Sequence, residues 1–329
     1  MEEKRILVLT TGGTIASMDG ENGLSPERGI DIIGLANVGA GFSVDVHEMF
    51  RLDSSNIQPE EWQSLAIEID SRKNEYDGIV ITHGTDTMAY TSSILAYMLR
   101  GIEIPVVLTG SQLPADHPLT DAIANLHIAF TFAGSGYPGV FIAFDRKVIL
   151  ATRAVKARTR SFSAFESINQ NPIAQADARG LVFNTIIEKT GSYDFKPDLC
   201  PDVFLLKLVP GTTPKSLQML IDAGYKGIVI EAFGAGGLHV FRRNLVVELK
   251  KAVEKGVSIV VVSQCLYEPS DFTIYEVGRM ALSAGVIEGR DMTSEAAVTK
   301  LMWALGNTKT PEEVRTIFNT SLAGEVTLR

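Results

Sequence analysis

Three short segments of the sequence carry side chains that could together perform covalent chemistry. Thr14 follows a pair of glycines, Thr85 directly precedes Asp86, and Lys156 lies in an arginine-containing segment. A hydroxyl can act as a nucleophile when a neighbouring base takes its proton, and the base needs a further group that orients it. Two hydroxyls, a carboxylate and an amine could therefore form a site for nucleophilic catalysis, provided that the fold brings them together.

The segment Thr10-Thr11-Gly12-Gly13-Thr14-Ile15 directly follows a short apolar run. Ligands of open α/β sheets bind at the carboxyl ends of strands, and two glycines allow a tight turn with space beside Thr14. A plain glycine turn with an incidental threonine explains the same residues. A phosphate-binding loop fits poorly, because no lysine follows the glycines as the G-x-x-x-x-G-K-[ST] pattern requires.

The segments around Asp86 and Lys156 each allow a structural and a chemical interpretation. Asp86 or Thr85 could cap a helix that begins near Thr87. Alternatively, the carboxylate could stay ionised at the helix N-terminus and join a proton relay. Lys156 could be a solvated charge near Arg158 or, beside a buried carboxylate, a base toward a hydroxyl. Neither segment decides between its two interpretations by itself.

Continuous runs rich in Val and Ile predict strands that are covered on both faces. They are Arg5–Thr10, Gly78–Thr82, Pro105–Thr109, Gly139–Phe144, Val203–Val209, Gly227–Ala232 and Val257–Ser263. Helical patterns lie between them at Pro59–Lys73, Thr87–Arg100, Asp116–Ala133 and Asn244–Lys255. Alternating strands and helices indicate an α/β fold with a doubly wound, mainly parallel sheet.

Two segments depart from this alternation, and a third divides the chain. Phe42–Arg51 alternates loosely, as expected of a half-exposed or edge strand, and Lys147–Arg153 indicates an antiparallel excursion. The polar, proline-containing stretch 189–201 predicts a linker. We therefore expect a large N-terminal domain over residues 1–188 and a smaller C-terminal α/β domain over residues 202–329.

Composition argues against several classes of protein. The 329 residues carry a formal net charge of −9 and no run of more than two basic residues, which disfavours nucleic-acid binding. Cys200 and Cys265 form no CxxC pattern, and His47-Glu48 lacks the second histidine of H-E-x-x-H, so we expect no metal site. No stretch approaches the roughly 18 apolar residues of a membrane span, and no signal sequence is evident. A cytoplasmic protein is expected.

Two of the segments singled out above resemble the signature motifs of the L-asparaginases. Thr11–Ala16 (TGGTIA) and His83–Thr87 (HGTDT) match these motifs in order. Val155-Lys156, with Ala164–Ser167, is similar to the region of the family's catalytic lysine, and Lys300–Leu305 resembles the cytoplasmic, type I branch. The resemblance covers essentially the whole chain.

This resemblance implies an amidohydrolase that converts L-asparagine to L-aspartate and ammonia without a cofactor. Thr14 would be the nucleophile that attacks the side-chain amide carbon and forms an acyl-enzyme, which water then hydrolyses. Thr85, Lys156 and Asp86 would form a second relay, in which Lys156 draws a proton and Asp86 supports it.

The resemblance also implies how the substrate is held and how the protein assembles. Asp53, Ser54 and Ser55 match the segment that grips the substrate's α-carboxylate and amine, and Asp86 would also meet the amine. The family builds its site at an intimate dimer interface, so a homodimer or homotetramer is expected. The implied fold is again a large N-terminal and a smaller C-terminal α/β domain.

The sequence departs from the family pattern at two positions. Leu24 stands about where members commonly carry a tyrosine in the mobile loop beside the nucleophile, so another contact must replace it, or Leu24 serves as a hydrophobic lid. Glu231 stands where some bacterial members use an arginine to bind regulatory asparagine, which predicts weaker or absent regulation of that kind.

Two other functions compete with the amidohydrolase. An ammonia-generating subunit of a tRNA-dependent amidotransferase resembles asparaginase in its core, but is expected to carry an additional N-terminal domain. A two-domain small-molecule binder would need no Thr/Asp/Lys relay. The preference for asparagine over glutamine is not readable from the sequence, because one methylene in such a pocket is worth only about 1–3 kcal/mol.

Overall fold

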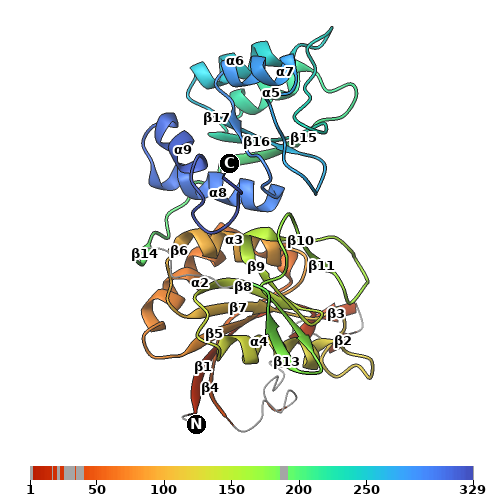
Figure 1. The fold of residues 1–329 in the computed structure, drawn as a ribbon, viewed down its shortest axis with the longest axis vertical. Coiled ribbons are helices and arrows are strands. Elements are labelled where there is room, and N and C mark those ends of the chain that lie inside the picture. The colour runs from red at the N-terminus through yellow and green to blue at the C-terminus, as the bar shows by residue number, and fades with distance from the viewer. Residues whose placement is uncertain are drawn as a thin grey trace. The chain divides into compact units, whose positions relative to one another are not determined.

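The chain folds into two compact units, Met1–Pro197 and Asp198–Arg329 (Figure 1). The computed structural model describes residues 3–16, 18–20, 23–25, 34, 41–185 and 192–328, and side chains within this set except at 16–25. Each unit is built around its own sheet, and each is described by itself below.

The first unit is built on an eight-stranded sheet in the order β13-β12-β9-β8-β7-β5-β1-β4. Its parallel part consists of β4 (Phe42–Leu52), β1 (Lys4–Gly12), β5 (Gly78–Thr82), β7 (Pro105–Thr109) and β8 (Gly139–Phe144). From β1 the chain first adds β4 on one side, and then β5, β7 and β8 on the other. The order therefore reverses between β1 and β5, which makes this the topological switch point of the sheet.

The remaining strands of this sheet are antiparallel. β9 (Lys147–Leu150) returns along β8, and β12 (Ala174–Asp177) and β13 (Gly180–Phe183) continue the edge. Among the residues that the structure describes, three small strand pairs of this unit lie outside the sheet. They are β2 (Met18–Gly20) with β3 (Gly23–Ser25), β6 (Leu99–Arg100) with β14 (Asp194–Phe195), and β10 (Ala154–Lys156) with β11 (Phe165–Ser167).

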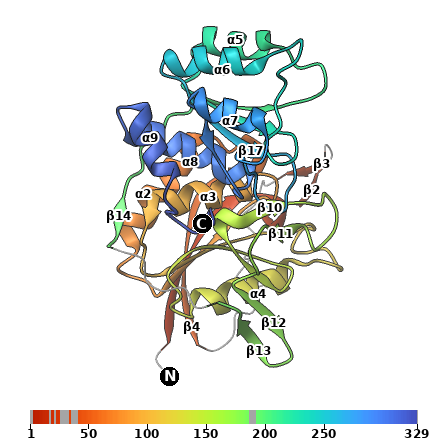
Figure 2. The same cartoon turned by 45° about the horizontal axis from the view of Figure 1, so that its top comes forward.

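Helices cover both faces of the eight-stranded sheet. α3 (Met88–Met98), with α2 (Pro59–Arg72) beside it, lies on one face, and α4 (Ala122–Ala133) lies on the other (Figure 1). Figure 2 shows α4 next to the β12–β13 hairpin. The face under α4 is a continuous apolar core, because alternate residues of the buried strands meet one side of the helix. This double cover explains the near-continuous hydrophobicity of β1, β5 and β7.

The second unit has a four-stranded, all-parallel sheet in the order β15-β16-β17-β18. Its strands are Val203–Lys207, Gly227–Ala232, Ser258–Ser263 and Ile287–Glu288. Its helices are α5 (Pro214–Asp222), α6 (Leu245–Glu254), α7 (Glu276–Ser283), α8 (Ser294–Asn307) and α9 (Pro311–Phe318). Buried residues from the strands and from α5, α6 and α7 form its apolar core.

The α/β fold with two mainly parallel sheets is confirmed, and four strands have the predicted bounds. Phe42–Leu52 is indeed an edge strand, and Lys147–Leu150 is antiparallel. The prediction of a helix from Asp116 is wrong at its start, since α4 begins at Ala122. The side chain of Asp121 instead accepts hydrogen bonds from the backbone of the preceding turn. The helix expected to reach Arg100 ends at Met98, because Leu99 and Arg100 pair with β14.

Candidate active site

The predicted site residues follow neighbouring strands at one edge of the first sheet. Thr10 of β1 pairs with Thr82 of β5, so the turns that carry Thr14 and Thr85 leave the sheet side by side. They lie at the carboxyl ends of the two strands that flank the switch point, which is where open α/β sheets bind ligands. The strand order thus supports a site at this edge, independently of any motif.

The glycine pair before Thr14 is required by close backbone packing. Gly12 and Gly13 have φ values of 101° and 79°, which L side chains rarely adopt. A Cβ on Gly12 would lie 2.5 Å from the Leu52 carbonyl oxygen, and one on Gly13 would lie 2.4 Å from the Gly84 nitrogen. The turn is therefore wedged between the ends of β4 and β5. Thr14 directly follows Gly13, begins a short 3₁₀ turn and is half-buried.

The second segment is joined to Lys156 through its hydroxyl and its carboxylate. Lys156 Nζ lies 2.7 Å from Thr85 Oγ1 and forms an ion pair with Asp86. Thr87, and neither Thr85 nor Asp86, occupies the cap position of α3. The capping interpretation is thus wrong, and the interpretation that links a hydroxyl, an amine and a carboxylate fits the contacts.

A β-hairpin delivers Lys156 to this edge. Lys156 is the last residue of β10 and pairs with Phe165 of β11. Its side chain is only 17% exposed, whereas that of Asp86 is 62% exposed. Of the two interpretations that the sequence left open for Lys156, the solvated surface charge is therefore wrong. The amine is partly withdrawn from water, while the carboxylate beside it remains open to an incoming group.

Asp53, Ser54 and Ser55 lie on the turn after β4, next to the same edge. The Asp53 carboxylate accepts hydrogen bonds from the Ser55 hydroxyl at 2.5 Å and the Ser55 backbone N–H at 2.8 Å. These bonds, together with the charge of Lys156 and against partial burial, lower the pKa of Asp53. Asp53 and Ser55 are exposed, so an ionised carboxylate and a hydroxyl face solvent here.

Ser54 is placed differently from its two neighbours. It is buried under Gly84, where its hydroxyl accepts the backbone N–H of Asp86 at 3.2 Å. Its carbonyl oxygen accepts the Thr87 hydroxyl at 2.7 Å. Ser54 therefore fastens the turn after β4 to the turn after β5, and its predicted contact with a ligand stays a prediction.

His83 supports the turn from below. It is fully buried, with Nδ1 2.7 Å from the Gly84 carbonyl oxygen and Nε2 3.0 Å from the Thr91 hydroxyl. Burial lowers its pKa from 6.5 to about 4, so the imidazole is neutral at pH 7. Its ring holds the backbone at Gly84, in agreement with a structural role.

Gln112 is a polar residue of this edge that the sequence reasoning missed. It lies three residues after Thr109, which pairs with Thr82 of β5, and Thr85 stands at the corresponding position after Thr82. Its side-chain oxygen is 3.5 Å from Thr85 Oγ1. The pattern that could have revealed it is the one used for Thr14 and Thr85, namely polar residues directly after a buried parallel strand.

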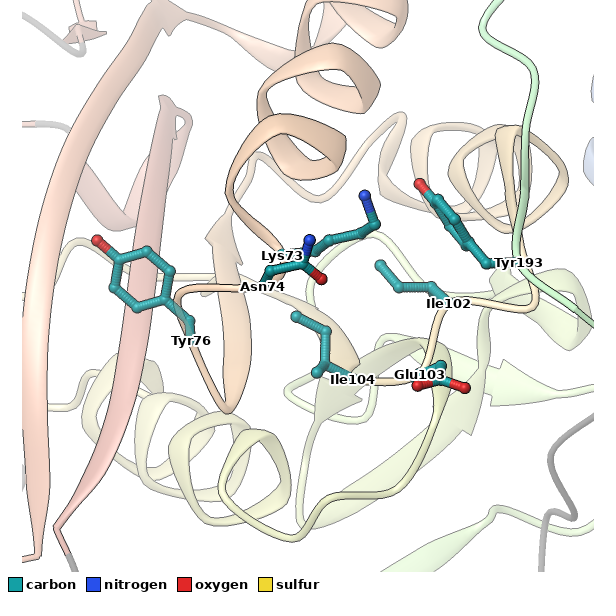
Figure 3. A pocket seen from close by; sticks show the side chains of 7 residues that line it. All are labelled: Lys73, Asn74, Tyr76, Ile102, Glu103, Ile104 and Tyr193. Carbon is teal, nitrogen blue, oxygen red and sulfur yellow. The ribbon is translucent and has the colours of Figure 1, made fainter.

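A pocket at the opposite, amino-terminal edge of the same sheet provides a contrast. It has a volume of about 440 Å³ and is lined by Lys73, Asn74, Tyr76, Ile102, Glu103, Ile104 and Tyr193 (Figure 3). Lys73 Nζ donates to Asp70 Oδ1 at 2.7 Å and lies 4.6 Å from the centre of the Tyr193 ring. The Tyr193 hydroxyl donates to the same carboxylate at 2.8 Å. This lysine is held in a structural ion pair, so the carboxyl edge remains the better candidate for chemistry.

Metal and membrane sites find no support in the described part of the chain. Within it, no group of three or more His, Cys, Asp or Glu side chains could hold a metal ion. None of its helices is both long enough and apolar enough to cross a bilayer.

Comparison with known proteins identifies the family. Residues 5–188 match the family model described as "Asparaginase, N-terminal", and residues 202–318 match the "Glutaminase/Asparaginase C-terminal domain". The chain belongs to the asparaginase family. An L-asparaginase from Thermococcus kodakarensis is 45% identical over 98% of this chain and 99% of its own.

Solved asparaginase structures share the fold as well as the sequence. The thermostable L-asparaginase from Thermococcus kodakarensis superimposes with a TM-score of 0.93 at 44% identity, covering 98% of this chain and 99% of the other. L-asparaginase I from Vibrio cholerae gives a TM-score of 0.89 at 31% identity, covering 99% and 100%. A component of the glutamyl-tRNA(Gln) amidotransferase from Thermococcus kodakarensis is 37% identical over 98% of this chain but only 76% of its own.

Two positions where this asparaginase departs from the family pattern have different outcomes. The side chain of Leu24, in β3, lies outside the described residues, so its role stays a prediction. Glu231 accepts the Ser294 hydroxyl at 2.6 Å and lies 3.4 Å from Lys207 Nζ. Its carboxylate is thus engaged within the second unit, and the predicted weakness of asparagine regulation remains to be tested by kinetics.

Proposed function

We propose that this asparaginase hydrolyses L-asparagine to L-aspartate and ammonia through a threonine nucleophile and an acyl-enzyme. The observation that carries the proposal is the placement of Lys156 Nζ 2.7 Å from Thr85 Oγ1 and in contact with Asp86, beside the glycine turn that presents Thr14. An amine that touches both a hydroxyl and a carboxylate has the partners of a base with its orienting group.

Thr14 forms the covalent bond. Its Oγ attacks the side-chain amide carbon of the substrate, the carbon–nitrogen bond breaks, and the nitrogen leaves as ammonia with the proton that the hydroxyl gave up. The resulting ester on Thr14 is then attacked by water, which releases L-aspartate and returns the proton to the threonine. Both half-reactions need a nearby group that accepts and returns one proton.

The group that accepts and returns this proton consists of Thr85, Lys156 and Asp86. As the base, the Lys156 amine takes a proton from Thr85 or, through it, from the attacking water, and Asp86 stabilises the ammonium that forms. Partial burial of the amine strengthens its electrostatic contact with Asp86, because less water screens the pair.

The turn after β4 recognises the amino acid part of the substrate. Asp53 is ionised and exposed, which suits an ammonium group, and the Ser55 hydroxyl can donate to the substrate's α-carboxylate if it turns away from Asp53. The exposed carboxylate of Asp86 offers a second contact to the substrate amine. Ser54 contributes mainly by holding the two turns together.

The remaining attributes are proposed on the family resemblance. The protein is cytoplasmic, works without a metal or cofactor, and assembles as a homodimer or homotetramer with the site at the dimer interface. Sedimentation velocity of the purified chain tests the assembly, and a strictly monomeric, fully active enzyme would contradict it.

A second candidate function follows from the similarity to the amidotransferase component. In that role the chain would generate ammonia for a tRNA-bound substrate. The L-asparaginase relative is the more identical of the two and aligns along almost its whole length, which favours free asparagine as the substrate.

The decisive experiment measures ammonia release from L-asparagine by the purified chain alone, without metal, nucleotide, tRNA or partner protein. Steady turnover supports the proposal. Ammonia release only with a partner protein and tRNA would favour the amidotransferase, and asparagine binding without ammonia would favour a binding protein.

Thr14→Ala and Thr85→Ala test the assignment of residues. Each variant should lose at least about a thousandfold in kcat while keeping the melting temperature of the wild type. Thr131→Ala is the matched control, because Thr131 is exposed on α4 and its hydroxyl only bonds the His127 carbonyl oxygen. Near-normal turnover in either active-site variant would overturn the assignment.

A further inference from the structure

The loop over residues 157–163 joins β10, which ends at Lys156, to β11. Two backbone bonds close its base, from the Ala157 N–H at 2.8 Å and the Arg158 N–H at 3.2 Å to the Ala164 carbonyl oxygen. Residues 157–162 are exposed, so burial of apolar side chains does little to fix this loop. Because Lys156 directly precedes the loop, motion of the loop backbone would also displace the Lys156 amine.

Gln112 fastens this loop to the end of β7. Its Nε2 donates to the carbonyl oxygens of Thr159 at 3.2 Å and Ser161 at 3.0 Å. Carbonyl oxygens can only accept hydrogen bonds, so the amide nitrogen must face the loop and the amide oxygen must face Thr85. The orientation of the Gln112 amide is thus dictated by its partners.

The backbone at Gln112 is itself held by a buried network. Asp121 accepts the backbone N–H groups of Gln112 and Leu113 at 3.0 Å and 3.2 Å. Asn125, which is 2% exposed, donates to Asp121 and to the Gly110 carbonyl oxygen. Buried, satisfied polar networks of this kind fix one conformation. The amide of Gln112 is therefore carried on a rigid support.

We propose that Gln112 is a positioning residue of the hydrolytic site, which clamps the loop over residues 157–163 and thereby holds Lys156 against Thr85. The inference rests on the proposed function and adds to it a residue that acts through Lys156 and Thr85. Arg158 ties the start of the same loop to its end, with Nη2 2.5 Å from Glu166 and Nη1 3.0 Å from the Ser163 carbonyl oxygen. Loss of the Gln112 clamp therefore loosens the loop without unfolding the hairpin.

The amide oxygen has a second effect on the relay. When Lys156 is an ammonium, it donates to Thr85 Oγ1, so the hydroxyl hydrogen must point elsewhere. Gln112 Oε1, at 3.5 Å, is the acceptor on that side. In that state the lone pair of Thr85 is directed at Lys156, and the hydroxyl hydrogen turns from Gln112 to the amine once Lys156 is the free base that accepts it.

Kinetics of two variants test the clamp. Gln112→Ala removes the amide that donates to the carbonyl oxygens of Thr159 and Ser161. Gln112→Glu keeps the side-chain volume but replaces the donating NH₂ group by an oxygen, which these carbonyl oxygens repel. Each should lower kcat on L-asparagine by about ten- to a hundredfold, since small misplacements of a catalytic group have effects of this size. KM should change less than about threefold, because the contacts of Asp53 and Asp86 with the substrate are kept. Gln63→Ala is the matched control, as Gln63 Nε2 also bonds a backbone carbonyl, that of Pro197, at 3.1 Å.

Limited trypsin digestion supplies a readout that does not depend on turnover. Arg160 lies in the loop, and its peptide bond should be cut severalfold faster in both Gln112 variants than in the wild type or Gln63→Ala, at unchanged melting temperature. A kcat within twofold of the wild type, or an unchanged rate of cleavage after Arg160, would overturn the proposal. If the wild type releases no ammonia, the proposed function fails, and the cleavage rates still decide whether Gln112 holds the loop.

Discussion

Two lysines of this protein each form an ion pair with a carboxylate, yet their surroundings differ. Lys156 is 17% exposed, and its partners are Asp86 and the hydroxyl of Thr85. Lys300 of α8 and its partner Glu325 are 0% exposed. The Lys300 ammonium also donates to the Thr320 carbonyl oxygen at 2.8 Å and lies 5.0 Å from the centre of a phenylalanine ring.

The partners decide what each lysine can do. Glu325 additionally accepts the backbone N–H groups of Leu322 and Ala323, so the carboxylate that pairs with Lys300 is held entirely by partners within the protein. Burial lowers the pKa of Lys300 while Glu325 raises it, and no substrate can reach the pair. Lys156 instead shares its amine with a hydroxyl at an open edge of the sheet. In the proposed mechanism, a lysine–carboxylate pair therefore gains a catalytic role through its third partner and its access to solvent.

Lys156→Met should produce the largest effect on activity. Without the amine no group takes the proton from Thr85, and kcat should fall by about 10²- to 10⁴-fold. Stability should change by less than about 1 kcal/mol, because partly exposed ion pairs contribute little. Steady-state ammonia release and urea unfolding check the two expectations. A Lys156→Met variant that keeps its activity but loses stability would show that Lys156, like Lys300, has a structural role only.

Lys300→Met should give the opposite result. It leaves Glu325 buried without its cation, which is expected to lower the free energy of unfolding of the second unit by about 3–5 kcal/mol. The kcat of the folded protein should stay within about twofold of the wild type. Trp303 is the one tryptophan of the second unit, so a Trp62→Phe background reports the unfolding of this unit alone.

A second substitution serves as the control for the buried pair. Glu325→Gln added to Lys300→Met removes the uncompensated charge and should recover part of the lost stability. Equal stability of the single and double variants would show that the pair contributes through packing of the lysine stem rather than through charge.

Much of the fold could be predicted because the buried strands are continuous apolar runs. Gly78–Thr82 and Pro105–Thr109 are buried along their whole length, and their bounds follow directly from hydrophobicity. The order of the strands does not follow from hydrophobicity, because contacts between residues far apart in the sequence place β1 between β4 and β5. The switch point that explains the location of the site could therefore not be predicted from the sequence.

The site was predictable where a hydroxyl or charge directly follows a strand. Thr14 and Thr85 were found in this way, but each segment alone also fitted a turn or a cap. Gln112 was missed because its importance arises from two carbonyl oxygens of a loop some 50 residues away. The Lys300–Glu325 pair was missed for a related reason, as its partner comes from the irregular C-terminal segment.

The pH dependence of stability offers another way to compare the two units. His83, whose pKa is shifted by burial, lies beneath the turn that carries Thr85 in the first unit. Its pKa is about 4 in the folded state and 6.5 in the unfolded state, so between these values the unfolded chain binds a proton that the folded chain does not. Stability of the first unit should therefore fall as the pH drops from 6.5 to 4, by about 3 kcal/mol in all. Above pH 6.5 this contribution is fully present.

The measurement uses the tryptophan of the first unit. Trp62 Nε1 donates to the Thr91 hydroxyl, which also contacts His83, and a Trp303→Phe background leaves Trp62 as the only tryptophan. Urea unfolding from pH 7 to pH 4 should show the loss in this background and a smaller loss after His83→Gln. His127→Gln, at an exposed position on α4, is the control. Identical pH dependence in the two histidine variants would contradict the assignment.

Lys73→Met is the most stringent test of the comparison and has the smallest expected effect. Lys73 resembles Lys156 in exposure, at 21%, and in its carboxylate partner, Asp70, but its third partner is the Tyr193 ring at the amino-terminal edge of the sheet. Because the proposed substrate site lies at the opposite edge and the Tyr193 hydroxyl already donates to Asp70, kcat and KM should stay within about twofold of the wild type, and stability should fall by no more than about 1 kcal/mol. If Lys73→Met reduced kcat as strongly as Lys156→Met, partial burial beside a carboxylate would explain the effect of both substitutions, and the contact with Thr85 would no longer distinguish the catalytic lysine.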